Sequence, residues 1–162
     1  MADITSNKKQ TRSSVNTIMS WGTIIYLVAI FAGGLADFFY HIEIISNSIA
    51  KIIGFALIVL ATAIIFWAAI SARRLIRNIS NEVSVDVFKT GSYCFSRNPT
   101  YLGLSFLVAG LGFIANSLPI LAAAFVAFAT VHFTALKQEE QALEDRFGEI
   151  YRGYKREVRR WL

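Results

Sequence analysis

The sequence predicts an all-α integral membrane protein with about four transmembrane helices. The chain has 162 residues, of which 55% are hydrophobic and 17% are charged, whereas an ordinary soluble domain has roughly 25% charged residues. The mean hydropathy of +0.50 agrees with this bias. Charged residues are also absent from three long stretches, residues 13–36, 52–72 and 98–136. Since a helix needs about 20 apolar residues to cross the hydrocarbon core, these stretches predict membrane-spanning helices.

Each of the first two stretches fits one membrane crossing. The first contains 24 residues and the second 21, close to the length that a crossing requires. The first stretch follows the basic residues of an N-terminal tail, residues 1–17, and this order of a basic start and an apolar stretch is also that of a signal peptide. Its length predicts a retained anchor instead, because signal-peptide cores span about 7 to 15 residues.

The third stretch has 39 residues, which is too long for one helix. It is interrupted by Asn116 and Ser117, and Pro119 follows shortly after. A polar pair followed by proline favours a tight turn, because proline can open a helix but does not continue one. We therefore predict a helical hairpin with arms from Pro99 to Ala115 and from Leu118 to Leu136. Both arms are short, so we expect them to stand steeply or to pack against other helices.

The basic residues predict the orientation of these helices. Three lie in the N-terminal tail, five in residues 73–97 and seven from residue 137 onward, whereas residues 37–51 hold one. Because cytoplasmic loops are enriched in Lys and Arg, we expect both termini to be cytoplasmic, in a chain typical of the bacterial inner membrane. The net charge of +5 then reflects a basic face beside anionic lipid and predicts no nucleic-acid partner. A single cysteine, Cys94, predicts neither a disulfide nor a metal site.

The first polar segment of interest runs from Val83 to Gly103. Valines alternate with other residues up to Phe88, which predicts an extended stretch that turns at Gly91 and Ser92. Asn98 and Pro99 then suit the N-cap and first position of a helix. One interpretation is a membrane-entry cap with interfacial aromatic residues. The other is an anion-binding helix N-terminus, helped by the neighbouring Arg97 and by close approach at Gly103.

The second polar segment runs from Lys137 onward and predicts an amphipathic cytoplasmic helix. Apolar or aromatic residues recur at steps of three or four, and Glu140 falls on this stripe. A carboxylate on a buried face needs a partner or a cationic ligand, and Arg146 is a candidate partner through a bound ligand. The other basic residues of the segment are assigned to the lipid surface. His132, one turn before the end of the fourth helix, suits a functional role and a packing role equally well.

Together the two segments resemble the isoprenylcysteine carboxyl methyltransferases and their relatives, the phospholipid methyltransferases. The first segment carries Gly91-Ser92-Tyr93 and then Arg97-Asn98-Pro99-Thr100-Tyr101-Leu102-Gly103. The second carries Glu139-Glu140-Gln141-Ala142-Leu143, Phe147-Gly148, Tyr151, Tyr154 and Val158-Arg159-Arg160-Trp161. One position departs from the family pattern, because Asn98 stands where the family has His. Asn keeps a hydrogen-bond donor and an acceptor but does not titrate near neutral pH.

The resemblance implies a single membrane-embedded domain, residues 1–162, that transfers a methyl group from S-adenosylmethionine to a lipophilic or lipidated acceptor, releasing S-adenosylhomocysteine. It assigns cofactor binding to residues 83–162, and Glu140 and Arg146 would border the reacting centre without a metal. The cofactor-binding residues that it implies are Val87, Phe88, Tyr93, Arg97, Asn98, Pro99, Thr100, Tyr101, Gly103, Glu139 and Glu140.

The sequence leaves two classes of methyl acceptor possible. A carboxylate acceptor, as in an isoprenylcysteine, arrives ionised and needs orientation by a cation such as Arg146. An amine acceptor, as in a phospholipid headgroup, must lose a proton, which would make Glu140 a general base. Two other functions are also considered: an NADPH-dependent reductase of the sterol type, which resembles the same half of the chain, and a non-enzymatic membrane scaffold or transporter subunit.

Overall fold

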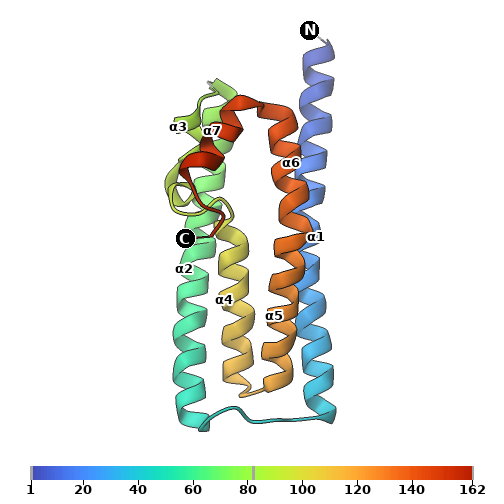
Figure 1. Cartoon of the computed structure of the whole chain (residues 1–162), viewed down its shortest axis with the longest axis vertical. Helices are drawn as coiled ribbons and strands as arrows, with labels where there is room; N and C mark the ends of the chain where they lie inside the picture. Colours follow the sequence, from blue (N-terminus) through green and yellow to red (C-terminus); the bar gives the residue numbers. More distant parts are fainter. Residues whose placement is uncertain (1, 82, 162) are drawn as a thin grey trace.

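The computed structural model describes residues 2–81 and 83–161, and these residues form helices joined by short connections (Figure 1). Among them there is no strand, so the predicted all-α fold is confirmed. The helices are α1 (Ala2–Phe39), α2 (Asn47–Asn81), α3 (Val85–Phe88), the 3₁₀ helix η1 (Gly91–Cys94), α4 (Pro99–Ile114), α5 (Leu118–Phe133), α6 (Ala135–Phe147) and α7 (Glu149–Glu157).

Three segments of the described chain are long and apolar enough to cross a membrane: Trp21–Phe39, Asn47–Ile79 and Leu118–Phe147. The fourth predicted crossing corresponds to α4, which is also apolar but has only 16 residues. At 1.5 Å per residue α4 is about 24 Å long, shorter than the roughly 30 Å hydrocarbon core. Helix α4 packs between α2 and α5 (Figure 1), as expected for a short helix that is sheltered by its neighbours.

Small residues bring α2 and α4 close together. A Cβ atom added at Gly54 would lie 2.7 Å from the Gly110 carbonyl oxygen, and one added at Gly103 would lie 2.6 Å from Ile65 Cγ1. Ala61 and Ala68 of α2 are fully buried. This spacing of small residues along two apolar helices is the usual means of close packing within a membrane. It therefore holds the start of α4 firmly against α2.

The hairpin between α4 and α5 turns at Asn116, as the sequence predicts. Asn116 has a φ of 49°, a left-handed conformation that Asn tolerates better than most residues. The Ser117 side chain then caps α5 by accepting a hydrogen bond from the Ile120 amide at 3.2 Å. Both arms of the hairpin end earlier than predicted: α4 ends at Ile114 instead of Ala115, and α5 ends at Phe133 instead of Leu136. Helix α5 ends where Thr134 adopts a φ of −114°, with its hydroxyl bonded back to the Thr130 carbonyl at 2.6 Å.

Two local predictions are wrong. Residues 85–88 are helical and not extended, because the extended Ser84 caps the short helix α3 and the Phe88 ring is buried. The single amphipathic helix predicted from Lys137 onward is instead divided into α6 and α7 at Gly148. Gly148 has a φ of 55°, which glycine adopts without strain. The turn lets α7 fold back over α3, and it buries Tyr151 and Tyr154.

The segments rich in basic residues gather at one end of the bundle. In Figure 1 the start of α1, the end of α2, α3, α6 and α7 lie at this end, and the connection between α1 and α2 lies at the other. Eleven of the 16 Lys and Arg residues belong to these elements, and four more, Lys89, Arg97, Arg159 and Arg160, belong to the connections that follow α3, η1 and α7. The arrangement agrees with a topology in which both termini share one side of the membrane.

Candidate functional site

The start of α4 presents a buried asparagine whose side-chain nitrogen has no hydrogen-bond partner among the described residues. Asn98 occupies the N-cap position, as predicted, but its side chain makes no capping hydrogen bond. Its backbone amide is satisfied by Ser96 Oγ at 3.2 Å. Asn98 is 8% exposed, and its Nδ2 atom is buried without a hydrogen-bond partner among the described residues. A buried amide group in this condition is free to bind a ligand.

Tyr101, one turn into α4, directs its hydroxyl into the same region. Its ring packs against α1 so closely that a Cβ atom added at Gly22 would clash with it. Tyr101 and Glu139 face each other at the range of a side-chain hydrogen bond, although neither the Tyr101 hydroxyl nor Glu139 Oε2 has a well-aligned hydrogen-bond partner among the described residues. The packing fixes the ring and holds its hydroxyl beside Glu139.

Tyr93 of η1 borders these groups from a third element. Its ring packs against the aromatic cluster around Phe88, and its carbonyl oxygen accepts a hydrogen bond from the Tyr154 hydroxyl at 2.8 Å. Burial, with Glu139 as the second cause, raises the pKa of Tyr93 to about 12. The phenol therefore stays protonated at neutral pH and can donate a hydrogen bond.

The buried polar atoms without a hydrogen-bond partner concentrate at this site. Six such side-chain atoms occur among the described residues, and five belong to Arg97, Asn98, Tyr101 and Glu139. Buried polar groups are nearly always paired in folded proteins, so a cluster of unpaired groups requires an explanation. All four residues are among those that the resemblance assigned to cofactor binding.

Glu140, next to Glu139, is the centre of an ion-pair cluster. Arg160 binds it with two donors, Nε at 3.0 Å and Nη2 at 2.7 Å. Arg97 Nη1 lies 3.2 Å from Glu140 Oε1, although not aligned as a hydrogen bond, and Lys155 Nζ lies 3.6 Å from Oε2. Glu140 is 5% exposed, which agrees with its predicted place on the buried stripe and its predicted need for a partner. Its negative charge raises the pKa of Arg160.

Arg160 and Lys155 were assigned to the lipid surface from the sequence, and the structure corrects this. They lie 20 and 15 residues beyond Glu140 in the chain, and the turn at Gly148 brings both back onto α6. Helical spacing cannot reveal a contact across such a turn. The position of Arg160 in the family-like Val158–Trp161 motif was the signal that could have identified it.

Arg146 does not join this cluster. It is exposed, and its guanidinium carbon lies 4.9 Å from the centre of the neighbouring Phe147 ring. The described contacts of Glu140 are with Arg97, Lys155 and Arg160 instead. The predicted role of Arg146 at the reacting centre therefore has no contact in its support.

The other predicted cofactor residues have largely structural contacts. The Phe88 ring packs on Phe147, Tyr151 and Tyr154, with ring centres 5.1 to 5.6 Å apart. The Val87 amide is held by Ser84, at 3.4 Å. Gly103 allows the close approach of α2, and Pro99 is buried at the first position of α4. Thr100, half-buried beside Pro99, has no side-chain contact that decides its role.

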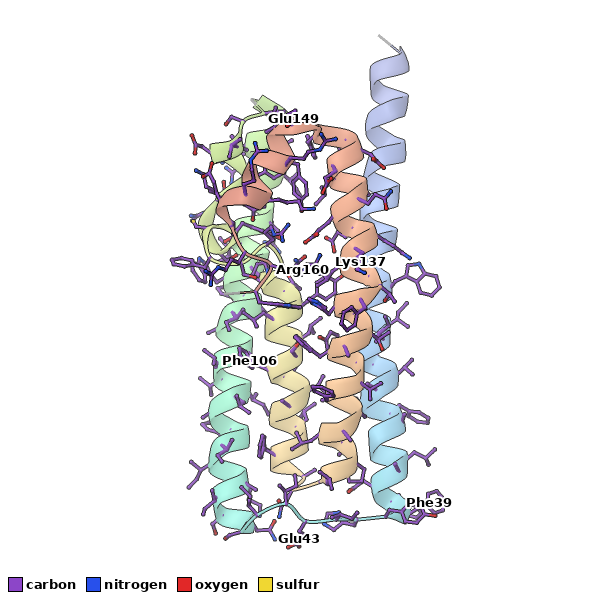
Figure 2. All side chains as sticks on the ribbon, in the orientation of Figure 1. Phe39, Glu43, Phe106, Lys137, Glu149 and Arg160 are labelled. Atoms are coloured by element: carbon purple, nitrogen blue, oxygen red, sulfur yellow. The ribbon has the colours of Figure 1, made fainter. Side chains whose placement is uncertain are left out.

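A polar cleft connects the ion-pair cluster with the surface. It has a volume of about 410 Å³ and is lined by Lys137, Glu140, Gln141, Glu144, Asp145, Lys155 and Arg160. Figure 2 shows Lys137 and Arg160 at the same level of the bundle, well above the apolar region that contains Phe106. The cleft therefore lies at the basic end of the molecule.

These features define a class of protein: a helical membrane protein with a cluster of buried polar side chains at one end of its bundle. The sequence model of the phospholipid methyltransferase family matches residues 49–150, more than half of the chain. The chain belongs to this family, which supports a membrane methyltransferase and agrees with the resemblance found in the motifs. Searches among curated proteins and among solved structures gave no match.

Proposed function

We propose that this protein transfers a methyl group from S-adenosylmethionine to a lipophilic acceptor, either an isoprenylcysteine-like carboxylate or a phospholipid-like headgroup. The observation that carries the proposal is the cluster of buried, unpaired polar atoms on Arg97, Asn98, Tyr101 and Glu139. A buried cluster of this kind costs stability unless a polar ligand pairs with it. The family of the chain supplies the reaction class.

The residues of the site fit the polar end of this cofactor. The amino-acid part of S-adenosylmethionine carries a carboxylate and an ammonium group. Arg97 Nε and Asn98 Nδ2 are donors for a carboxylate and have no hydrogen-bond partner among the described residues, and Glu139, which faces Tyr101, offers Oε2 as an acceptor for an ammonium group. Tyr101 and Tyr93 add hydroxyl groups beside Glu139. Donors and acceptors of both kinds are therefore available in one buried region.

When bound, the cofactor would supply a methyl group that its sulfonium has already activated. The protein then has to orient the acceptor and keep water out. The buried start of α4 and the packing of Tyr101 on Gly22 exclude water and hold the hydroxyl in place. The cleft beside Glu140 gives a soluble ligand access from the basic end, and the apolar helices below it suit a lipid tail.

Glu140 serves this reaction by holding cations in place. Three basic side chains surround its carboxylate, and Arg160 occupies both of its oxygens. A carboxylate bound in this way is a poor general base, because its charge is already stabilised by its partners. An ionised carboxylate acceptor needs no base. An amine acceptor would depend on Glu139, whose Oε2 atom is unpaired.

The decisive test is titration calorimetry of the detergent-purified protein with S-adenosylhomocysteine. We expect micromolar binding that Tyr101→Ala abolishes. The Tyr101→Phe variant keeps the ring on Gly22 and removes only the hydroxyl, so it should weaken binding about fivefold. Tyr40→Ala, an exposed tyrosine at the opposite end, is the matched control and should bind as the wild type does.

The role of Glu140 is tested separately by activity. Glu140→Gln should abolish methyl transfer while the protein remains folded and extractable. The substitution removes the negative charge that positions the three surrounding basic side chains. Full turnover by Glu140→Gln or by Tyr101→Ala would refute the assigned site. Binding of reduced nicotinamide in place of S-adenosylhomocysteine would point to the reductase instead.

A further inference from the structure

Residues 158–161 form a short strap that crosses the site after α7. Val158 is extended and buried, and it follows directly on the last helical residue, Glu157. The Arg159 carbonyl accepts a hydrogen bond from the Arg97 amide at 3.1 Å. The Arg160 carbonyl accepts one from Ser96 Oγ at 3.0 Å. The strap is therefore bonded to the segment that immediately precedes α4.

The far end of the strap is anchored on His132. The Trp161 indole nitrogen donates to His132 Nδ1 at 3.0 Å. The two rings are stacked with centres 5.8 Å apart, and Trp161 also packs on Phe128 at 4.9 Å. For the indole to donate, Nδ1 must carry no hydrogen, so the ring hydrogen is on Nε2. His132 thus supplies both a hydrogen-bond acceptor and a stacking surface.

Arg160 lies between these two anchors and reaches Glu140. Its Nη1 atom also approaches the His132 carbonyl at 3.5 Å. Arg97 shares this carboxylate, with Nη1 3.2 Å from Oε1, and its Nε atom has no hydrogen-bond partner among the described residues. Because the strap brings Arg160 to Glu140 and binds the Arg97 amide, it helps to fix where the donors of Arg97 lie.

We propose that His132 is a positioning residue: through Trp161 it keeps the strap closed over the site, and the closed strap sets Arg160 and Arg97 for ligand binding. This inference rests on the proposed function for the identity of the ligand. The closure itself is a property of the chain and can be measured without a ligand.

The first experiment measures closure by limited trypsin digestion of the purified protein in detergent, with cleavage after Arg159 and Arg160 followed by mass spectrometry. His132→Phe keeps an aromatic ring and removes the acceptor, so we expect strap cleavage about fivefold faster, as for the loss of one hydrogen bond worth about 1 kcal/mol. His132→Asn places an oxygen near the position of Nδ1 and should restore part of the protection. Phe125→Ala, at an exposed position on α5, is the control and should cleave as the wild type does.

The second experiment measures the dissociation constant of S-adenosylhomocysteine for the same variants. His132→Phe should weaken binding about fivefold, and Trp161→Phe, which removes the other half of the same hydrogen bond, should do the same. The double variant, with both substitutions, should bind S-adenosylhomocysteine no more weakly than either single variant, because all three variants lack the same hydrogen bond. A structural role alone would lower thermal stability without this pattern in the dissociation constants.

The two experiments separate the two proposals. Wild-type protein that fails to bind S-adenosylhomocysteine would overturn the proposed function, and the trypsin comparison would still test the closure. Wild-type cleavage rates in His132→Phe would overturn the role of His132. Effects of His132→Phe and Trp161→Phe that multiply in the double variant would overturn it as well.

Discussion

Two buried asparagines at opposite ends of the bundle show how structure and function are divided in this protein. Asn116 is 1% exposed, and every polar group of its side chain is used. Its Oδ1 atom accepts from the Ile44 and Ile45 amides, at 3.2 and 3.3 Å. Its Nδ2 atom donates to the Ile45 carbonyl at 2.8 Å and to Asn47 Oδ1 at 3.4 Å. This asparagine ties the α4–α5 turn to the connection between α1 and α2.

Asn98 is almost as deeply buried, yet its side-chain nitrogen is unpaired, and so are atoms of its neighbours Arg97, Tyr101 and Glu139. A satisfied buried amide stabilises a fold, whereas an unsatisfied one costs free energy. The contrast agrees with the proposed function, in which the end containing Asn116 stabilises the fold and the end containing Asn98 binds the cofactor. Substitutions at the two ends should therefore affect stability and binding differently.

The two ends should differ completely in accessibility across the membrane. Cys94 is exposed at the basic end, so we expect an impermeant thiol reagent to label it only after the cytoplasmic side has been opened. Glu43→Cys in a Cys94→Ser background should react from the outside in intact cells. Labelling of Cys94 from the outside would contradict the expected topology. Labelling only from the cytoplasmic side would place the candidate site where a cytoplasmic cofactor can reach it.

Asn116→Ala should destabilise the protein by about 3 kcal/mol. The substitution leaves two backbone amides without their acceptor, and alanine tolerates the φ of 49° poorly. Thermal unfolding in detergent measures the loss. Below the unfolding temperature the affinity for S-adenosylhomocysteine should be unchanged, and a large loss of affinity would show that the two ends are not independent.

Asn98→Ala should have the opposite profile. We expect affinity for S-adenosylhomocysteine to fall about tenfold, as for the loss of a hydrogen bond to a charged group. Thermal stability of the free protein should change little, because the side chain makes no capping bond. Unchanged affinity together with a drop in stability would make Asn98 a structural residue like Asn116. Asn98→His, which restores the family residue, tests whether a titratable ring alters turnover.

Arg146→Ala should have the smallest effect, a change in affinity and in turnover of less than about twofold. Arg146 is exposed and packs on Phe147, and surface substitutions of this kind usually change stability by less than about 0.5 kcal/mol. Arg97→Ala is the comparison and should abolish binding, since Arg97 faces Glu140 and carries unpaired donors. A loss of activity in Arg146→Ala would restore the assignment made from the sequence.

Several features of the site followed directly from the sequence. The isolated acidic residue on an apolar stripe identified Glu140 as a buried charge that needs a partner, and the structure confirms both properties. The motif around Arg97 and Tyr101 predicted cofactor-binding residues, and several of these carry buried polar atoms without a well-aligned hydrogen-bond partner. Their binding of a cofactor stays a prediction. The burial of Glu140 could be predicted because it depends on local chemistry, namely the cost of burying a charge.

Other features depended on contacts between distant residues. The partner of Glu140 was predicted six residues away, at Arg146, and lies 20 residues away, at Arg160. The predicted extended stretch near Val85 is helical because Ser84 caps it and because Phe88 is buried against residues of α6 and α7. Neither outcome can be read from periodicity, since each is decided by a surface that another part of the chain supplies.

The amino-acid sequence by itself determined that the chain is helical, that it enters the membrane, and where its charges gather. These properties follow from the transfer of apolar residues out of water and from the need to satisfy every backbone amide within the bilayer. Which polar groups are paired follows only from the folded chain. The backward turn at Gly148 brings Arg160 to Glu140 and Trp161 to His132, at 2.7 and 3.0 Å. A hydrogen bond requires its two atoms to lie within a few tenths of an ångström of their preferred separation, and only the tertiary structure sets that separation.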